Sequence, residues 1–512
     1  MIATTARHHA WSALAVLALA AGILAFCGGR LVYSLDDAYI HLSVAEQIAA
    51  GGYGINPGEF SAPSSSILWD FLSAPFSSTG VHHLIPLLIN IASLFWSVSL
   101  IHKIILMILP AAAGLKACAI AFWFAVGVNL FGLVFTGMEH SLQVAVTLAV
   151  MLGVVESASG RGVRRSMIAA MIVGPAIRYE LLAVTLGAAV ILFFQGRRKT
   201  AIVALAGSLI PLLAFSLFLV SRGFPPLPSS VLAKLAEGGL SGGLGGMPAN
   251  RLRLYTTDSD AFRFLFLLSL LPVALHWRRD RPSRLVAAFG VIVGLSHLLV
   301  GRYGWFGRYH IYSTVVLLLS LAWSFRNDLN ALLPRGKGFG RLGILMIPLT
   351  VFLLPELSVT VKTPLASRVV FLQHGVMRRI ALAYGDRVAV NDIGWVSYGN
   401  PNHVLDLWGL ANEESRRHHL ERGTGWVGRL VEADGAGLVM LYGSVFGVEV
   451  PENWTRVAVL GMTGPVVLGY PEVDIYLTPT GDSLRVITAL LRVAETLPPG
   501  AILDFTGETL RQ

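Results

Sequence analysis

The feature that most constrains this chain is a succession of long apolar runs separated by short basic stretches. A helix needs about 20 apolar residues to cross the hydrocarbon core of a bilayer. The candidate runs are residues 11–29, 84–109, 117–136, 138–157, 166–177, 181–195, 200–221, 261–276, 284–301, 308–325 and 342–359. Only 13% of the residues are charged, against about 25% in a typical soluble domain. The pattern predicts an α-helical polytopic membrane protein with about eleven transmembrane helices.

The basic clusters between these runs predict how the helices are oriented. Lys and Arg collect in cytoplasmic loops, and with about eleven spans the main clusters all fall on one side. That side is then cytoplasmic together with the amino terminus, whereas the loops 30–82 and 221–260 and everything after residue 360 lie outside. The runs 166–177 and 181–195 are short, so we expect a helical hairpin. Arg178 and Glu180 at its turn are either a structural ion pair or part of a functional site.

The same distribution of charge argues against a nucleic-acid partner. The net charge is +9, but most basic residues stand between apolar runs, where they orient helices. The two cysteines, Cys27 and Cys118, both lie in apolar runs. Neither a disulfide framework nor a metal cluster follows from them.

The composition changes after residue 360. Apolar segments near 387–394, 404–407 and 437–442 read as buried strands, and they alternate with helical stretches at 364–384 and 482–496. This alternation is typical of a small α/β domain. We therefore divide the chain into a transmembrane domain, residues 1–360, and an extracytoplasmic α/β domain, residues 361–512.

Two groups of charged residues stand at the predicted outer face. Asp36 and Asp37 begin the longest polar interval of the first half, where carboxylates either cap a helix or act in a site. Arg302 and Arg308 stand among aromatic residues at the outer end of a span. They read either as interfacial anchors or as a clamp for a lipid phosphate, because guanidinium groups bind phosphate oxygens in bidentate fashion.

An ordered set of short motifs resembles the GT-C superfamily of membrane glycosyltransferases, which use polyprenyl-phosphate sugars. Asp36–Ile40 resembles the acidic motif of that superfamily. Further segments resemble the branch that contains the mycobacterial terminal β-arabinofuranosyltransferase: 56–59, 64–69, 136–139, 178–180, 228–234, the Arg308 region, 391–394 and 405–410. Tyr179, His140 and Ser229 depart from the pattern, and the short soluble tail leaves an arabinose donor in doubt.

The resemblance implies an activity, a membrane and partners. The protein would move a sugar from a polyprenyl-phosphate-sugar donor to a glycan, lipid or protein acceptor of the cell envelope, with inversion. The reaction would take place on the outer face of the bacterial cytoplasmic (inner) membrane, among membrane lipids. Two alternatives stay open, a transporter or flippase for a polyprenyl-linked glycan and a non-catalytic envelope-assembly protein. The first is disfavoured because no internal repeat is visible, and the second because about eleven helices exceed what an anchor needs.

The resemblance also implies roles for single residues. The expected set is Asp36, Asp37 and Glu139 as catalytic carboxylates, Arg308, Arg302 and Lys234 at the donor phosphate, and Tyr39, His41, Arg178, Glu180 and His140 in cavity or structural positions. The three carboxylates would suit a divalent metal, Mg²⁺, Mn²⁺ or Ca²⁺, but metal use stays open. Because adjacent residues do not share a helix face, one of Asp36 and Asp37 should face the cavity while the other caps the helix that follows. We expect Asp36, which stands nearer the end of the first span, to be the base and Asp37, immediately before the helix, to be the cap.

Overall fold

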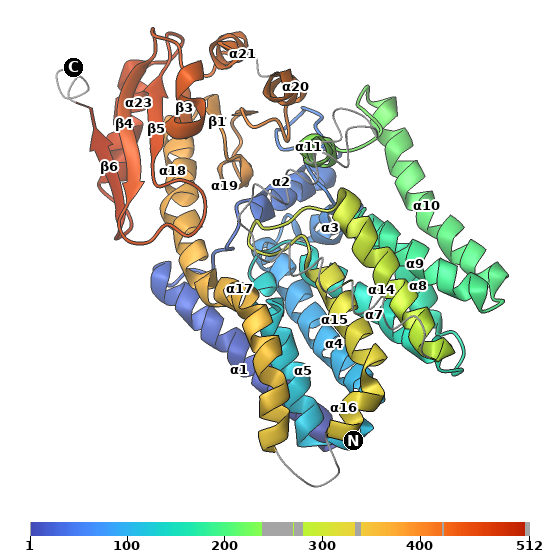
Figure 1. Cartoon of the computed structure of the whole chain (residues 1–512). Helices are drawn as coiled ribbons and strands as arrows, with labels where there is room; N and C mark the ends of the chain where they lie inside the picture. Colours follow the sequence, from blue (N-terminus) through green and yellow to red (C-terminus); the bar gives the residue numbers. More distant parts are fainter. Residues whose placement is uncertain (1, 238–269, 271–279, 333–338, 422–423, 507–512) are drawn as a thin grey trace.

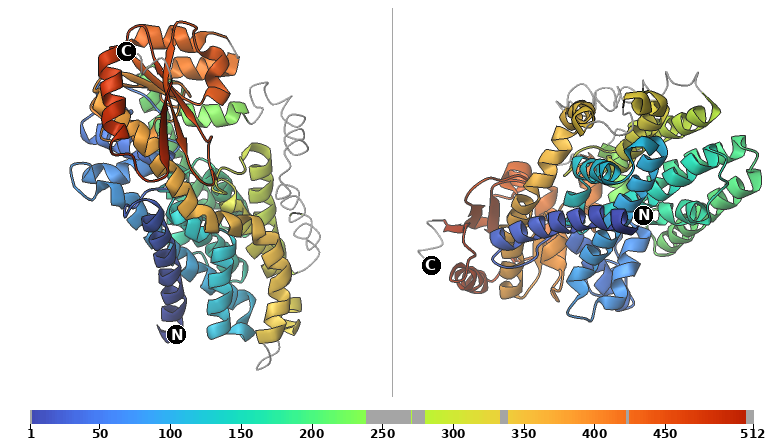
Figure 2. Two further views of the ribbon diagram at one scale, coloured as in Figure 1. Left: turned by 90° about the vertical axis from the view of Figure 1, so that its left-hand side faces the viewer. Right: turned by 90° about the horizontal axis from the view of Figure 1, so that it is seen from below.

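The computed structural model describes residues 2–237, 270, 280–332, 339–421 and 424–506. A body of long helices carries a mixed β-sheet domain at one end (Figure 1). The amino terminus lies at the opposite end of the helical body, and the last described strand lies in the sheet domain (Figure 2). The helical body is thus separated along the chain and in space from most of the sheet.

Helices form at the apolar runs. Their bounds are α1 Ile2–Phe26, α4 Ile85–Ile108, α5 Leu115–Gly127, α6 Leu130–Val134, α7 His140–Ala158, α8 Arg165–Ile177, α9 Leu181–Phe194, α10 Arg198–Ser221, α14 Arg281–Val300, α15 Ile311–Ser324, α16 Arg326–Leu332 and α17 Phe339–Leu372. The expected run 261–276 lies outside the described residues. In the described ranges, six helices are long and apolar enough to cross a membrane. The number of spans and their orientation therefore stay predictions.

One expected span is divided. Residues 117–136 form α5 and α6 rather than one helix, because Asn129 adopts a left-handed conformation with φ of 58°. Asn is one of the few residues that tolerate this conformation. Its side chain is fixed from two directions, since Oδ1 accepts a hydrogen bond from Thr360 at 2.8 Å and Nδ2 donates to the carbonyl of Phe306 at 3.3 Å. At this break, the side chain of Asn129 thus links α17 to the loop before α15.

The predicted hairpin at 166–195 is present as α8 and α9. Pro175 stands in the last turn of α8, and Arg178 after it is extended, with φ of −151° and ψ of 133°. Leu181 begins α9, and its amide donates to the carbonyl of Arg178 at 3.0 Å. Arg178 and Glu180 therefore lie at a tight turn between two short helices, as expected.

The loop 30–82, which we call the first outer loop after its predicted side of the membrane, folds into short helices between the helical body and the sheet domain. They are α2 Asp37–Ala49, α3 Ile67–Ser73 and the 3₁₀ turns η1 Ala74–Phe76 and η2 His82–Leu84. Ile40 and Val44 of α2 are buried in the same apolar cluster as Val376 and Ile380 of α18 (His374–Tyr384). The loop therefore packs against the first helix of the sheet domain.

The carboxy-terminal part forms the predicted α/β domain. Its strands are β1 Val388–Val390, β2 Val404–Asp406, β3 Leu438–Leu441, β4 Thr455–Met462, β5 Val473–Leu477 and β6 Ala501–Phe505. The order in the sheet is β2-β1-β3-β5-β4-β6, in which β2, β1 and β3 are parallel and the other pairs antiparallel. Its helices are α18 His374–Tyr384, α19 Gly394–Ser397, α20 Glu413–Glu421, α21 Trp426–Asp434, α22 Gly443–Phe446 and α23 Ser483–Ala494.

Both faces of the sheet are covered. Along β3, Leu438 and Met440 join one apolar cluster, which includes α18 and α23, whereas Val439 and Leu441 join a second cluster with α21. This alternation follows from the two-residue period of a strand. The helix α17 passes through the expected domain boundary at residue 360 and ends at Leu372, so one continuous helix connects the two parts.

Candidate functional site

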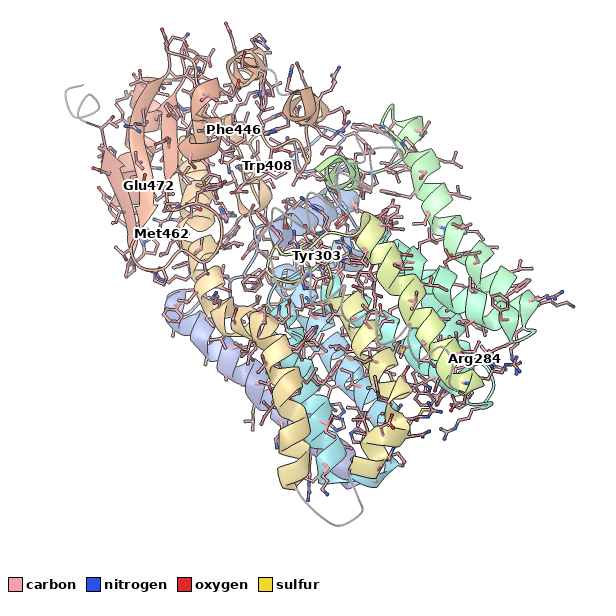
Figure 3. All side chains as sticks on the ribbon, viewed as in Figure 1. Arg284, Tyr303, Trp408, Phe446, Met462 and Glu472 are labelled. Atoms are coloured by element: carbon pink, nitrogen blue, oxygen red, sulfur yellow. The ribbon has the colours of Figure 1, made fainter. Side chains whose placement is uncertain are left out.

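A cavity lies where the first outer loop, the loop before α15 and the sheet domain meet. Its lining residues come from both parts of the chain: Leu35, Asp36, Asp37, Ile40, His41, Pro63, Ser65, Met138, Ser230, Ala233, Arg302, Trp305, Arg308, Tyr309, Val369, His374, Asn391, Asp392, Ile393, Trp408, Leu410, Tyr442, Leu468, Gly469 and Tyr470. Figure 3 shows Tyr303 on the helical side of this region and Trp408 on the sheet side, while Arg284 lies far from both.

Asp36 joins the first outer loop to the sheet domain. Its Oδ2 accepts a hydrogen bond from the amide of Gly394 at 2.7 Å, and its Oδ1 accepts one from the amide of Trp395 at 2.8 Å. Glycine is needed at 394, because a Cβ there would overlap the backbone oxygen of Asp36 and lie 2.6 Å from its Oδ2. The acidic motif is therefore held by backbone groups more than 350 residues later in the chain.

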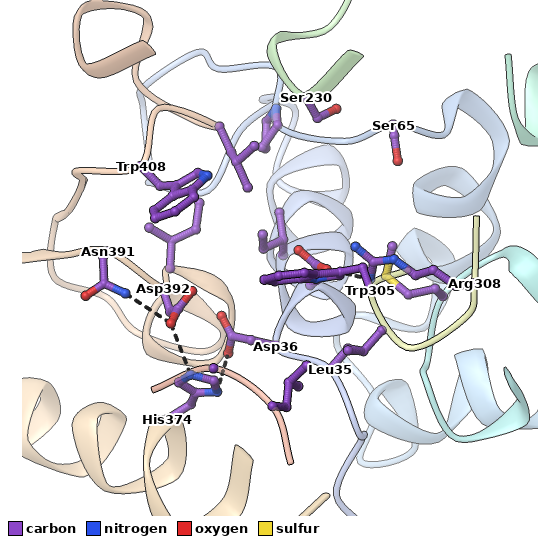
Figure 4. Close-up of a pocket in the computed structure, with 18 of the residues that line it drawn as sticks. Leu35, Asp36, Ser65, Ser230, Trp305, Arg308, His374, Asn391, Asp392 and Trp408 are labelled. Carbon is purple, nitrogen blue, oxygen red and sulfur yellow. Dashed lines mark hydrogen bonds and ion pairs between the residues drawn. The ribbon is translucent and has the colours of Figure 1, made fainter. Parts of the chain in front are cut away.

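His374 and Asp392 stand beside Asp36, as Figure 4 shows. The imidazole Nδ1 is 3.6 Å from Asp36 Oδ1, and Nε2 is 3.3 Å from Asp392 Oδ2. Burial raises the pKa of Asp36 to about 6, and the charge of Asp392 adds to this rise, while His374 and the Trp395 amide oppose it. Sequence reasoning missed His374 and noted Asp392 only within a motif. The position of Asp392, just after the parallel strand β1, was the available signal, because ligands bind beyond the carboxyl ends of such strands.

Asp37 faces the cavity from the first turn of α2. Its Oδ2 lies 2.5 Å from Nη1 of Arg308, whose Nη2 donates to the hydroxyl of Tyr309 at 2.7 Å. The side chain of Asp37 is 27% exposed, against 11% for Asp36. Asp36 occupies the N-cap position of α2 and its side chain makes no capping hydrogen bond there. The expectation that Asp37 caps α2 is therefore wrong, because its carboxylate pairs with Arg308.

The loop before α15 presents both predicted arginines to this cavity. Residues 304–307 all have positive φ, including Trp305 at 49° and Phe306 at 65°. Such a conformation costs roughly 1–2 kcal/mol for each residue that is not glycine. The loop turns sharply there, so Arg302 and Arg308 line the same cavity, and Arg302 lies 5.8 Å from the ring centre of Tyr309. The side chain of Lys234, the third predicted cation, lies outside the described residues.

Glu139 is buried beside the cavity instead of lining it. Its side chain is 0% exposed, and its Oε1 accepts a hydrogen bond from Arg178 at 2.6 Å. Arg178 also contacts Glu180 at 2.5 Å, and His41 lies 3.5 Å from the second oxygen of Glu139. His41 in turn contacts the buried Asp70 at 2.6 Å. Of the two readings of Arg178 and Glu180, the geometry favours a buried ion network that supports the cavity.

The other two predicted cavity residues, Tyr39 and His140, contact aromatic rings. The ring of Tyr39 stacks on Trp395 with centroids 4.7 Å apart, which adds an apolar contact to the hydrogen bonds of Asp36. His140 is buried, with its ring 5.9 Å from that of Tyr309. Both residues thus brace elements that carry cavity residues.

The three carboxylates proposed as metal ligands do not converge. Asp36 is held by backbone amides, Asp37 by Arg308 and Glu139 by Arg178. Within the part of the chain that the structure describes, the group of three or more ligand atoms close enough to share an ion contains none of them. These residues therefore do not fit a shared divalent metal in this arrangement.

Residues 369–476 match a family that is described as a domain of unknown function (DUF8728). This segment includes α18, strands β1 to β4 and all of β5 except its last residue. No curated protein sequence matches the chain.

Similar solved structures include three proteins. One is ArnT from Cupriavidus metallidurans bound to undecaprenyl phosphate, with TM-score 0.46 and 12% identity over 92% of this chain and 99% of that chain. Another is the arabinofuranosyltransferase AftD from Mycobacteria, with TM-score 0.46 and 15% identity over 92% of this chain and 41% of that chain. The third is the oligosaccharyltransferase of Archaeoglobus fulgidus in complex with zinc and sulfate, with TM-score 0.45 and 11% identity over 96% of this chain and 74% of that chain.

Proposed function

We propose that the protein is an integral membrane glycosyltransferase. It moves a sugar from a polyprenyl-phosphate-sugar donor to a glycan, lipid or protein acceptor of the cell envelope, with inversion at the anomeric carbon. The single observation that carries this proposal is the pair of Asp37 and Arg308, with Arg302 nearby, in one cavity. A proton acceptor and two cations side by side suit a reaction in which a hydroxyl is deprotonated and a phosphate departs.

The proposed reaction is a direct displacement. Asp37 accepts the proton of the acceptor hydroxyl, whose oxygen forms a bond to the anomeric carbon. The bond between that carbon and the phosphate oxygen breaks, and the phosphate leaves with the electron pair. Arg308 and Arg302 stabilise its charge, because guanidinium groups in a partly buried site interact strongly with phosphate oxygens.

The proposal assigns Asp37 the role of base and Asp36 a positioning role. Asp37 has the more exposed carboxylate of the two, and it already contacts the cation that would meet the donor phosphate. Both oxygens of Asp36 hold backbone amides of the sheet domain. Asp36 therefore keeps the sheet domain in place over the cavity.

The test is transfer of radiolabelled sugar from a panel of polyprenyl-phosphate pentoses, hexoses and aminosugars to acceptors in purified membranes. Asp37→Asn should lower the rate about 10²- to 10⁴-fold, the contribution of a positioned base. Arg308→Lys keeps the charge but loses the planar fork, so it should weaken use of donor. Asp386→Asn is the matched control, because Asp386 also pairs with an arginine but is exposed and does not line the cavity.

Two results would contradict the proposal. The first is an Asp37→Asn enzyme that transfers sugar at the control rate with saturating donor. The second is wild-type protein that moves the intact lipid-linked glycan across vesicles without cleaving it, which is what a flippase does.

A further inference from the structure

A second cluster of reactive side chains lies at the other end of the helical body. It consists of His8 of α1, His102 of α4 and Cys118 of α5, and we call it the His8–His102–Cys118 cluster. One ligand atom from each residue lies within 4.8 Å of the other two. The end of α1 that carries His8 lies opposite the sheet domain (Figure 1). The cluster is therefore remote from the cavity and has no part in the proposed transfer.

Three of the four histidine nitrogens of this cluster are buried and have no hydrogen-bond partner. His8 is 0% exposed, and neither of its ring nitrogens has a hydrogen-bond partner. His102 is buried too, with a backbone hydrogen bond to Ala117 and no partner for Nδ1. A buried polar atom without a partner is destabilising, so each such atom calls for a water or an ion that satisfies it. An ion at this place would bind one unsatisfied nitrogen of each histidine and the sulfur of Cys118.

We propose that the His8–His102–Cys118 cluster binds Zn²⁺. Two imidazoles and a thiolate are ligands that zinc prefers, whereas Mg²⁺ and Ca²⁺ take oxygen ligands. In tetrahedral zinc sites with bonds of about 2.0–2.3 Å, ligand atoms stand roughly 3.3–3.6 Å apart. Rotation of the side chains that moves the ligand atoms by about 1 Å would close the cluster to that size. Water would be the fourth ligand.

The proposed role of the ion is to tie α1 to the helical body. Only 17% of the apolar span of α1 is buried, the smallest fraction among the six long apolar helices that the structure describes. The neighbouring His9 makes one polar contact to α4, from Nε2 to the hydroxyl of Ser99 at 3.1 Å. A metal that joins α1, α4 and α5 would hold the end of α1 where few apolar contacts do so.

The experiment is metal analysis of the full-length protein, purified in detergent without added chelator. We expect stoichiometric zinc in the wild type and a loss of most of it in His8→Ala and Cys118→Ser. Replacement of zinc by Co²⁺ should give a thiolate-to-cobalt charge-transfer absorption that Cys118→Ser lacks. Removal of the ion with a chelator should lower the midpoint of thermal unfolding, and added Zn²⁺ should restore it.

The matched control is Cys27→Ser, which removes the other buried cysteine and lies outside the cluster. It should keep both the zinc and the cobalt band. The proposal is overturned if the wild type purifies without zinc and does not take up Zn²⁺ or Co²⁺ on titration. It is equally overturned if His8→Ala and Cys118→Ser retain as much metal as Cys27→Ser.

Discussion

Replacement of Gly394 by alanine should loosen the sheet domain from the first outer loop. The new Cβ would overlap the backbone oxygen of Asp36 and lie 2.6 Å from its carboxylate. A backbone atom cannot rotate away, so α19 must move and its two amides must leave Asp36. Overpacking costs about 1–3 kcal/mol, and each hydrogen bond to a charged group contributes about 1.5–3 kcal/mol. Since these effects overlap, we expect the free energy of unfolding to fall by roughly 2–5 kcal/mol.

The assay is thermal unfolding of the purified protein together with limited proteolysis. Gly394→Ala should lower the unfolding midpoint, and it should release the sheet domain to protease sooner than the wild type does. Sugar transfer should fall as well, because the cavity is completed by this domain.

Gly461→Ala is the control for this substitution. Gly461 lies in β4, and a Cβ there would meet nothing within 4 Å. The control should be neutral or slightly stabilising, because alanine reduces the freedom of the unfolded chain. If Gly394→Ala and Gly461→Ala unfold at the same temperature and resist protease equally, the contact between Asp36 and α19 does not hold the domain.

Four further predictions concern other parts of the molecule. Arg178→Met removes the guanidinium that pairs with the buried Glu139 and leaves this carboxylate beside His41 at 3.5 Å, so it should destabilise the protein by about 3–5 kcal/mol in chemical unfolding, whereas Arg222→Met at an exposed position should not. Burial raises the pKa of Asp406 from its ordinary 3.8 to about 6. The stability that this shift contributes is therefore full below pH 3.8 and is lost as the pH rises through about 6. Asp406→Asn should gain stability relative to the wild type over that rise in pH, as measured by unfolding midpoints. Val448→Cys, at a position 89% exposed, should react with a membrane-impermeant thiol reagent in intact cells if the sheet domain lies outside. Because the two arginines of the cavity supply positive charge, transfer should persist after chelation of divalent ions, and complete loss that Mg²⁺, Mn²⁺ or Ca²⁺ restores would refute this.

The sequence predicted the elements better than their connections. The hairpin at 166–195 and the α/β domain followed from local patterns, namely apolar length, basic flanks and alternation of strand and helix. The division of 117–136 into two helices did not follow, because it depends on Thr360 and Phe306, which satisfy the side chain of Asn129 from distant parts of the chain. The sequence near Asn129 does not indicate such distant partners.

The sequence predicted which residues belong to the candidate site better than it predicted the role of each residue. Asp36, Asp37, Arg302 and Arg308 line one cavity, as the motifs suggested. Glu139 does not line it, because Arg178 holds its carboxylate in the interior. The roles of two adjacent aspartates depend on what each meets in space, and their shared residue type says nothing about that.

The sequence by itself therefore determined the fold class. Its apolar runs require helices, and the strands after residue 360 require a covered sheet, since both follow from burial of apolar surface at a local period. Only the tertiary structure decided that Asp36 holds Gly394, that Asp37 faces Arg308 and that His374 stands between Asp36 and Asp392. These contacts join residues hundreds of positions apart, and their energy depends on distance and burial, which exist only once the chain has folded.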